Sequence, residues 1–490
     1  MKVLCLFLFS LTVSLLAERP NFIFLFADDQ RPDTIGAFGN DQIKTPNLDK
    51  LINSGFSFRN NYCAGSYSGA VCVASRSMLM TGRHWPRIQD RKNWRGLPLL
   101  PELLGRHEYQ TFATGKWHNG ETTLARAFQS GKNIFMGGMC DHTKVPLQNL
   151  RLDGTLTEKT VSTRFSSETF ADTAIEFLQS DRDPNQPFFL YVAFTAPHDP
   201  RNPPEAYRET YYQQRPPLPP NFLPQHPFDN GHIRNGGRDE SLADWPRQPA
   251  VIGDQLCEYY GLITHLDEQV GRIVTALNKT KYQDNTYIIY TADHGLAMGS
   301  HGLLGKQNIY EHSMGSPLII SGPGVPRNQS TYALTYLLDL FPTICELSKS
   351  VQPTDVGGHD LSPLWTGKKK AVRDSIFLAF QQSMRAVRTE RWKLHIYPEI
   401  NHTLLYDLQQ DPHEIINLAT NPEQQDRVRE LTSLMKKWQR QVGDDQALFS
   451  KSPRSKPFDP TKVKRRLDVW QPKWIRDKYF QGRNNPDHGN

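Results

Sequence analysis

Runs of apolar and β-branched residues alternate with amphipathic runs over the first three hundred residues. Four of the apolar runs predict buried strands, at 21–27, 109–114, 188–195 and 285–291. Helices are predicted between them at 47–54 and at 255–277, where leucine, valine and isoleucine recur every three or four positions. This alternation predicts an α/β fold with a large, mostly parallel sheet sandwiched by helices. Ligand sites in such sheets lie at the carboxyl ends of the strands.

The pattern changes after about residue 370. Short strands are predicted at 375–379, 384–388, 393–396 and 404–407. A helix with one apolar face is predicted to follow at 423–442. These elements predict a smaller C-terminal antiparallel sheet with one helix. Residues 200–249 are dense in Pro, Asn, Gly and Arg without a clear period, so we expect an irregular insertion that packs over the site.

The first residues are typical of an export signal. Lys2 is followed by an apolar run at 3–16 and by the small residue Ala17. The run is too short for a membrane span and no later stretch is long enough, so we expect no membrane span and an exported protein, periplasmic or extracellular. The predicted organisation has four segments: a signal peptide at 1–17, a catalytic domain at 18–370, a small α+β subdomain at 371–445 and a basic aromatic tail at 446–490.

Composition supports a globular protein and argues against nucleic acid as a partner. Of the 490 residues, 38% are hydrophobic and 22% are charged, which is too apolar for a disordered chain. The net charge of +6 resides in the tail, because residues 451–490 hold eleven Lys or Arg against four Asp. The rest of the chain is close to neutral and offers no basic groove. We expect the tail to lie as a strap across the main domain or to contact a polyanion.

The cysteines point to one unusual thiol. Of the six, Cys5 falls in the predicted signal, and the remaining five are too few for a disulfide scaffold. Their odd number leaves at least one unpaired or chemically special. Cys72 is the candidate, because it precedes a predicted helix and Arg76 follows four positions later. A thiol at the positive end of a helix beside a cation suits an anion, although alone it would be interpreted as an ordinary buried cysteine.

Pairs of potential metal ligands follow two of the predicted strands. Asp28 and Asp29 close the first strand, and Asp293 and His294 follow the strand that ends at Thr291. Both members of a pair can converge only where the strand gives way to a loop. Three carboxylates and an imidazole suit a hard divalent cation such as Ca²⁺ or Mg²⁺ better than zinc. Four basic residues also lie beyond predicted strands or in nearby loops: Lys116, His118, His198 and Lys306.

In this order the motifs resemble those of the type I, formylglycine-dependent sulfatases of the alkaline phosphatase superfamily, over about residues 20 to 440. The residues that carry the resemblance are Asn21-Phe22-Ile23 with Asp28-Asp29, Thr45-Pro46-Asn47-Leu48-Asp49, Cys72-Val73-Ala74-Ser75-Arg76 with Thr81-Gly82-Arg83, Gly115-Lys116-Trp117-His118, Pro197-His198, Asp293-His294-Gly295 and Gly305-Lys306. The resemblance implies an alkaline phosphatase-like fold and a sulfuric ester hydrolase. It also implies that Cys72 is oxidised to formylglycine (3-oxoalanine) by a formylglycine-generating enzyme.

The family's mechanism then implies a role for each matching residue. One hydroxyl of the hydrated aldehyde at position 72 attacks sulfur, and the other expels sulfate as the aldehyde re-forms. Ca²⁺, with Mg²⁺ as the alternative, is held by the side chain at position 72 together with Asp28, Asp29, Asp293 and His294. Arg76 and Lys116 steady the sulfate charge, and His118 is the base for elimination.

His198 and Lys306 contact sulfate and protonate the leaving oxygen in this scheme. Four more residues lie in loops near the predicted mouth, where they are expected to bind substrate: His142, Asp199, Arg201 and His301. Two positions depart from the family pattern. Ala74 stands where many relatives have proline, and Gly315 stands where relatives often have an arginine.

Three functions remain open on the sequence. The first is hydrolysis of a sulfate ester, of a sulfated carbohydrate or another alkyl or aryl sulfate. The second keeps the fold but hydrolyses phosphonate monoesters or phosphodiesters, as relatives with a similar nucleophile string do. The third is non-catalytic binding of a sulfated glycan, which is disfavoured because each expected catalytic position is filled.

Overall fold

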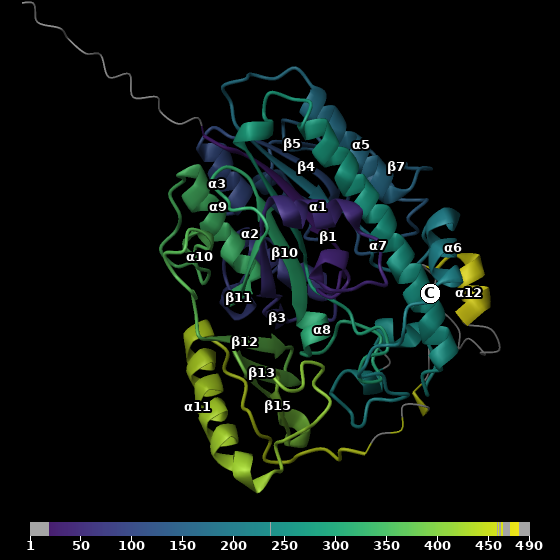
Figure 1. The fold of residues 1–490 in the computed structure, drawn as a ribbon. Coiled ribbons are helices and arrows are strands. Elements are labelled where there is room, and N and C mark those ends of the chain that lie inside the picture. The colour runs from purple at the N-terminus through teal and green to yellow at the C-terminus, as the bar shows by residue number, and fades with distance from the viewer. Residues whose placement is uncertain (1–18, 236, 458, 460–461, 464–470, 480–490) are drawn as a thin grey trace, which may run out of the picture.

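A computed structural model describes residues 19–479 except 236, 458, 460–461 and 464–470 (Figure 1). The predicted signal at 1–17 therefore lies outside the described residues, as do parts of the predicted basic aromatic tail. No helix among the described residues is long and apolar enough to cross a membrane.

A large mixed sheet forms the centre of the molecule. In the described part of the chain ten strands pair in the order β11-β2-β10-β9-β1-β8-β4-β5-β6-β7. Their bounds are β1 (Asn21–Ala27), β2 (Phe56–Tyr62), β4 (Gln110–Lys116), β5 (Ser130–Phe135), β6 (Pro146–Leu150), β7 (Thr160–Val161), β8 (Phe188–Ala193), β9 (Thr286–Ala292), β10 (Gly315–Ser321) and β11 (Gln329–Tyr336). The central strands β9, β1, β8, β4 and β5 are parallel, and β10, β6 and β7 pair antiparallel.

Helices cover both faces of this sheet, because successive side chains of a strand point to opposite faces. Phe22, Phe24 and Phe26 of β1 pack in one apolar cluster, whereas Ile23 and Leu25 pack in another. The helices of the first cluster are α2 (Val71–Thr81), α3 (Leu100–Arg106), α4 (Glu121–Ala127) and α9 (Leu340–Ser348). Those of the second are α1 (Pro46–Ser54), α5 (Ser166–Gln179) and α7 (Pro249–Leu277). The predicted sandwich is confirmed.

A second, smaller sheet lies at the lower end of the molecule in Figure 1. Four strands pair antiparallel in sequence order: β12 (Ser375–Phe380), β13 (Met384–Thr389), β14 (Trp392–Tyr397) and β15 (His402–Asp407). Helix α11 (Gln425–Val442) covers it with Leu431, Met435 and Trp438. The predicted small sheet with one helix is confirmed. Strand β3 (Gly65–Ser66), which was not predicted, pairs parallel with β12 and links the two sheets just before α2.

Several elements differ from the sequence prediction. The insertion 200–249 contains a regular helix, α6 (Glu205–Gln213), which packs on α7. Helix α7 begins at Pro249 rather than near residue 255, because proline is well suited to the first turn of a helix. The tail carries α12 (Lys473–Tyr479). The sequence did not predict the short helices α8 (Glu311–Met314) and α10 (Ser362–Trp365), the helices α3, α4, α5 and α9, or the strands β2, β5, β6, β7, β10 and β11. The domain boundaries at 18–370, 371–445 and 446–490 remain predictions.

Candidate functional site

The pairs Asp28-Asp29 and Asp293-His294 emerge side by side from the centre of the sheet. Strands β1 and β9 are parallel neighbours, and their last residues, Ala27 and Ala292, lie opposite each other. Asp28 and Asp29 therefore leave the sheet next to Asp293, whose Oδ1 accepts a hydrogen bond of 3.1 Å from the Asp29 backbone N–H. Asp29 has a φ of +68°, a left-handed conformation that costs free energy outside glycine and is typical of functional sites.

These side chains make a compact oxygen-rich cluster. Ligand atoms of Asp28, Asp29 and Asp293 lie within 4.8 Å of one another, as do those of Cys72, Asp293 and His294. All are buried. Asp28 Oδ1 and His294 Nε2 have no hydrogen-bond partner among the described residues. Buried polar atoms are normally satisfied, so these two unpartnered ligand atoms fit a site that holds a hard divalent cation.

Cys72 lies at the amino end of α2, on the same cluster. Its Sγ is 3.2 Å from His118 Nδ1 and 3.7 Å from Lys116 Nζ, and its side chain is a free thiol. The residue is only 2% exposed, so a substrate must present a small group deep in the site. Two glycines shape this part of the site. A Cβ on Gly115 would lie 1.8 Å from Ala193 O, and one on Gly138 would lie 2.6 Å from the His118 ring.

The His118 side chain is held as a neutral imidazole. Burial, reinforced by Lys116 and Arg76, lowers the pKa of His118 from 6.5 to about 3. Its backbone, like that of Asp29, is left-handed, with a φ of +66°. A neutral ring beside position 72 can accept a proton, which is the requirement for a general base.

Three buried cations balance the three carboxylates. Arg76 Nη2 lies 3.2 Å from Asp293 Oδ2 and 3.7 Å from Asp28 Oδ1. Lys116 Nζ pairs with Asp28 Oδ2, and Lys306 Nζ lies 2.8 Å from Asp29 Oδ2. Each of these buried cations therefore faces a carboxylate of the cluster. Binding of a dication would therefore leave an excess of positive charge, which favours an anionic substrate.

Lys306 and His198 form a hydrogen-bonded pair in which the lysine is the donor. His198 Nδ1 lies 2.8 Å from the Asp199 carbonyl oxygen, so Nδ1 carries the hydrogen and Nε2 is an acceptor. Lys306 Nζ donates to that Nε2 over 2.8 Å. Burial and then Lys306 hold the pKa of His198 well below its usual range. Burial alone would lower the pKa of Lys306, but Asp29 and Asp239 raise it well above the usual value, so the lysine is charged.

The four residues expected to bind substrate lie in different surroundings. His142 is buried, and its ring bonds Ser166, Thr195 and the His198 carbonyl oxygen, so it supports the His198 loop. Asp199 pairs with Arg238 and adjoins His198. Arg201 bonds Gln255 of α7. His301 stacks on Tyr310 with ring centroids 4.0 Å apart and belongs to a separate cluster with His312 and Glu414.

Two charged residues next to the site were not predicted from the sequence, Asp239 and Arg238. Asp239 lies in a short 3-10 segment of the insertion, 3.8 Å from Lys306 Nζ, and accepts a hydrogen bond of 2.8 Å from Gln307. Arg238 pairs with both Asp239 and Asp199. The only sequence signal was the charged run Arg238-Asp239-Glu240 inside a proline-rich loop, and such runs are usually solvated.

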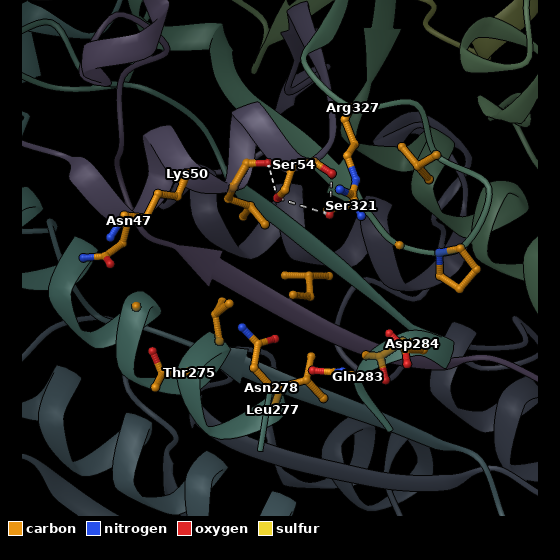
Figure 2. Close-up of a pocket in the computed structure, with 18 of the residues that line it drawn as sticks. Asn47, Lys50, Ser54, Thr275, Leu277, Asn278, Gln283, Asp284, Ser321 and Arg327 are labelled. Atoms are coloured by element: carbon orange, nitrogen blue, oxygen red, sulfur yellow. Dashed lines mark hydrogen bonds between the residues drawn. The ribbon is translucent and has the colours of Figure 1, made fainter. Parts of the chain in front are cut away.

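A wide groove at the opposite end of β9 has a different character. Its volume is about 840 Å³, and its lining includes Lys50 and Ser54 of α1, Asn278 after α7, and Arg327 (Figure 2). It lies at Thr286, where β9 begins, whereas Asp293 and His294 follow the other end of that strand. The described residues that line it include no cysteine or histidine. The reactive groups therefore gather at the carboxyl ends of the strands, away from this groove.

Comparisons with known proteins agree with this arrangement. A family model described as Sulfatase matches residues 20–350, and one described as N-sulphoglucosamine sulphohydrolase, C-terminal, matches residues 299–441. The chain is 27% identical over 462 residues to an arylsulfatase of Clostridium perfringens, across 85% of this chain and 94% of that protein. It is 25% identical over 500 residues to an N-acetylglucosamine-6-O-sulfatase of Bacteroides thetaiotaomicron, across 87% and 88%.

Solved structures share the fold. A protein solved with its substrate D-glucosamine-2-N,6-O-disulfate matches with a TM-score of 0.74 at 24% identity, over 87% of this chain and 99% of that one. A phosphonate monoester hydrolase of Agrobacterium radiobacter matches with a TM-score of 0.68 at 22% identity, over 86% and 96%. Since both identities are below 25%, these two similarities support the fold alone.

Proposed function

We propose that this chain, which belongs to the sulfatase family and is a sulfate ester hydrolase, acts through a formylglycine made from Cys72 and a bound divalent cation. The observation that carries the proposal is the convergence on one buried thiol. Cys72, at the amino end of α2, lies against His118, Lys116 and the Asp293 carboxylate, and Asp293 in turn clusters with Asp28 and Asp29. A simple buried cysteine would need none of these neighbours.

The cation that this donor set fits best is Ca²⁺, with Mg²⁺ as the alternative, because carboxylate oxygens dominate it. Asp28, Asp29, Asp293 and His294 would hold it beside position 72. When bound, the cation polarises sulfate oxygens, and the formylglycine supplies a hydrated aldehyde as the nucleophile. The modification requires a formylglycine-generating enzyme as a maturation partner.

The protein's own cations hold the sulfate charge. Arg76 and Lys116 are buried on the side of position 72, and both already face carboxylates, so neither has to be reoriented when a sulfate group enters. Preorganised charges of this kind stabilise a transition state without a reorganisation cost. The site therefore favours a group that carries negative charge on several oxygens.

Two proton transfers take place on separate sides of the site, one at His118 and the other at His198 and Lys306. His118, neutral and 3.2 Å from the Cys72 sulfur, takes a proton from the side chain at position 72. On the other side, Lys306 carries its proton and points it at His198 Nε2. These two residues deliver a proton to the oxygen of the departing alcohol or phenol, which needs protonation most when the alcohol is a poor leaving group.

The substrate class that we favour is a sulfated carbohydrate, with aryl sulfates as the simpler alternative. The relatives named for N-acetylglucosamine-6-O-sulfate and for aryl sulfates support both. The signal predicted at 1–17 makes an exported, periplasmic or extracellular enzyme the matching proposal, since sulfated polymers are met outside the cell. Amino-terminal sequencing of the mature protein tests it, and a start at residue 18 is expected.

Activity assays with matched cysteine variants test the proposal. The enzyme from a host that makes formylglycine should hydrolyse 4-nitrophenyl sulfate and release sulfate from a panel of sulfated oligosaccharides. Cys72→Ala should abolish turnover with an unchanged melting temperature, whereas Cys345→Ala, at a buried thiol of α9, should stay active. Faster cleavage of a nitrophenyl phosphonate ester than of the sulfate, or full activity of Cys72→Ala, would overturn the assignment.

A further inference from the structure

Helix α12 lies beyond the region matched by either family model, which ends at residue 441. The chain leaves α11 at the small sheet, yet α12 lies on the other side of the molecule, beside α6 (Figure 1). The C-terminal segment 471–479 therefore returns to the large domain. A segment that lies outside the matched regions and returns to the region of the site needs its own physical account.

The segment is anchored by apolar and charged contacts. Ile475 is 4% exposed and packs in a cluster with Leu242 and Leu256. The Trp474 ring lies 4.3 Å from the Arg208 guanidinium of α6. Lys478 Nζ lies 3.1 Å from Asp254 of α7. Contacts of three kinds hold the segment in one place, so its first residues are positioned as well.

Gln471, at the start of the segment, reaches a residue of the candidate site. It is 4% exposed, and its Nε2 donates a hydrogen bond of 2.7 Å to Asp199 Oδ2. Arg238 pairs with the same carboxylate. The cavity between Gln471, Asp199, Arg201 and Tyr479 has a volume of only about 10 Å³, so the glutamine is packed as well as hydrogen-bonded.

Asp199 in turn orients His198. The other carboxylate oxygen, Oδ1, lies 3.2 Å from His198 Nδ1, and the Asp199 carbonyl oxygen lies 2.8 Å from the same atom. These contacts keep the hydrogen on Nδ1 and turn Nε2 toward Lys306. A carboxylate that lost one of its partners could rotate, and the ring would lose part of its orientation.

We propose that Gln471 is a positioning residue for His198, which the C-terminal segment supplies by holding the Asp199 carboxylate. The proposal rests on the proposed sulfatase function, in which His198 and Lys306 protonate the departing oxygen. The C-terminal segment thus completes the leaving-group side of the site, although it lies about 270 residues away from Asp199 along the chain.

The test uses leaving groups of different quality in the full-length enzyme. Gln471→Leu and Gln471→Glu both remove the donor at nearly constant size, and the second also sets a carboxylate against Asp199. We expect kcat on a sugar or alkyl sulfate to fall about tenfold with KM nearly unchanged, the effect of losing one hydrogen bond to a charged group. On 4-nitrophenyl sulfate, whose phenol departs with little protonation, the loss should be at most about twofold. Gln409→Leu, at an exposed glutamine, is the matched control.

A merely structural role for Gln471 predicts another result. It would lower the melting temperature and reduce activity on both substrates equally, or on neither, and either outcome overturns the inference. Crystal structures of the wild type and of Gln471→Leu give a readout without turnover: the Asp199 carboxylate and His198 ring should rotate in the variant, and unchanged positions overturn the inference. If the wild type cleaves no sulfate ester, the proposed function fails by itself, and these structures still decide the positioning of His198.

Discussion

Replacing Lys116 by methionine removes a buried ammonium with little change of side-chain volume. Lys116 and Asp28 are both fully buried, and the ammonium pairs directly with Asp28 Oδ2. Arg76 is 3.7 Å from the other carboxylate oxygen, which has no hydrogen bond among the described residues. The variant therefore leaves the Asp28 carboxylate buried without a direct hydrogen bond from a cation.

The expected loss in the free energy of unfolding follows from the burial of this ion pair. Removing one partner of a buried ion pair costs about 3–5 kcal/mol, because the remaining charge stays desolvated. Unfolding entropy scales with length and is roughly 1 kcal/mol per kelvin for a chain of this size. The melting temperature of Lys116→Met should therefore fall by about 3–5 °C in a chelating buffer. Calcium should restore part of the loss, because the cation would take over as the counter-charge of Asp28.

Differential scanning calorimetry with and without calcium measures both effects. Lys132→Met is the control, since the Lys132 and Glu176 side chains are 45% and 63% exposed and their ion pair contributes less than about 1 kcal/mol. If Lys116→Met and Lys132→Met have the same melting temperature in the chelating buffer, the buried Asp28 carboxylate does not depend on this ammonium. The pairing of cations and carboxylates described for the site would then be wrong.

Three further expectations test other parts of the account. A chelator should lower both the activity and the melting temperature of the wild type, and calcium should restore them; an indifferent enzyme would argue against the cation site. His118→Ala should accumulate protein with covalently bound sulfate, seen by intact mass, because the base for its release is missing, and absence of that species would reassign the base. Burial, followed by Arg373, lowers the pKa of His84 from 6.5 to about 3, so its contribution to stability is complete above pH 6.5 and is lost as pH falls toward 3. Between pH 7 and pH 5 this is about 2 kcal/mol, and His84→Gln should flatten the pH dependence of unfolding by that amount; an equal slope in the variant would refute the shift.

The site residues at strand ends could be predicted from the sequence. The hydrophobic pattern shows where each strand ends, and parallel strands end at the same edge of the sheet. Asp28 and Asp293 follow neighbouring strands whose final residues are in register, so their proximity follows from the fold class. Cys72 and Arg76 are four apart at the start of a helix, which sets them on one face. For such residues local pattern and topology suffice.

The positions of loop residues could not be predicted from the sequence in this way, because tertiary contacts decide where these residues lie. Asp239 comes close to Lys306 only through the folding of the insertion, whose Pro-rich sequence has no period. His301, expected at the mouth, instead stacks on Tyr310 beside Glu414, which comes from the C-terminal part of the chain. Gln471 lies far along the chain from Asp199, so no local pattern could join them. Each placement depends on contacts between segments that are distant in sequence.

Mass spectrometry of the peptide that contains position 72 tests the central claim most directly. In active enzyme from a competent host, the account predicts a side chain about 18 Da lighter than cysteine, with the extent of conversion proportional to the specific activity across preparations. An unmodified thiol at position 72 in fully active enzyme would contradict the claim that an oxidised side chain there cleaves the ester.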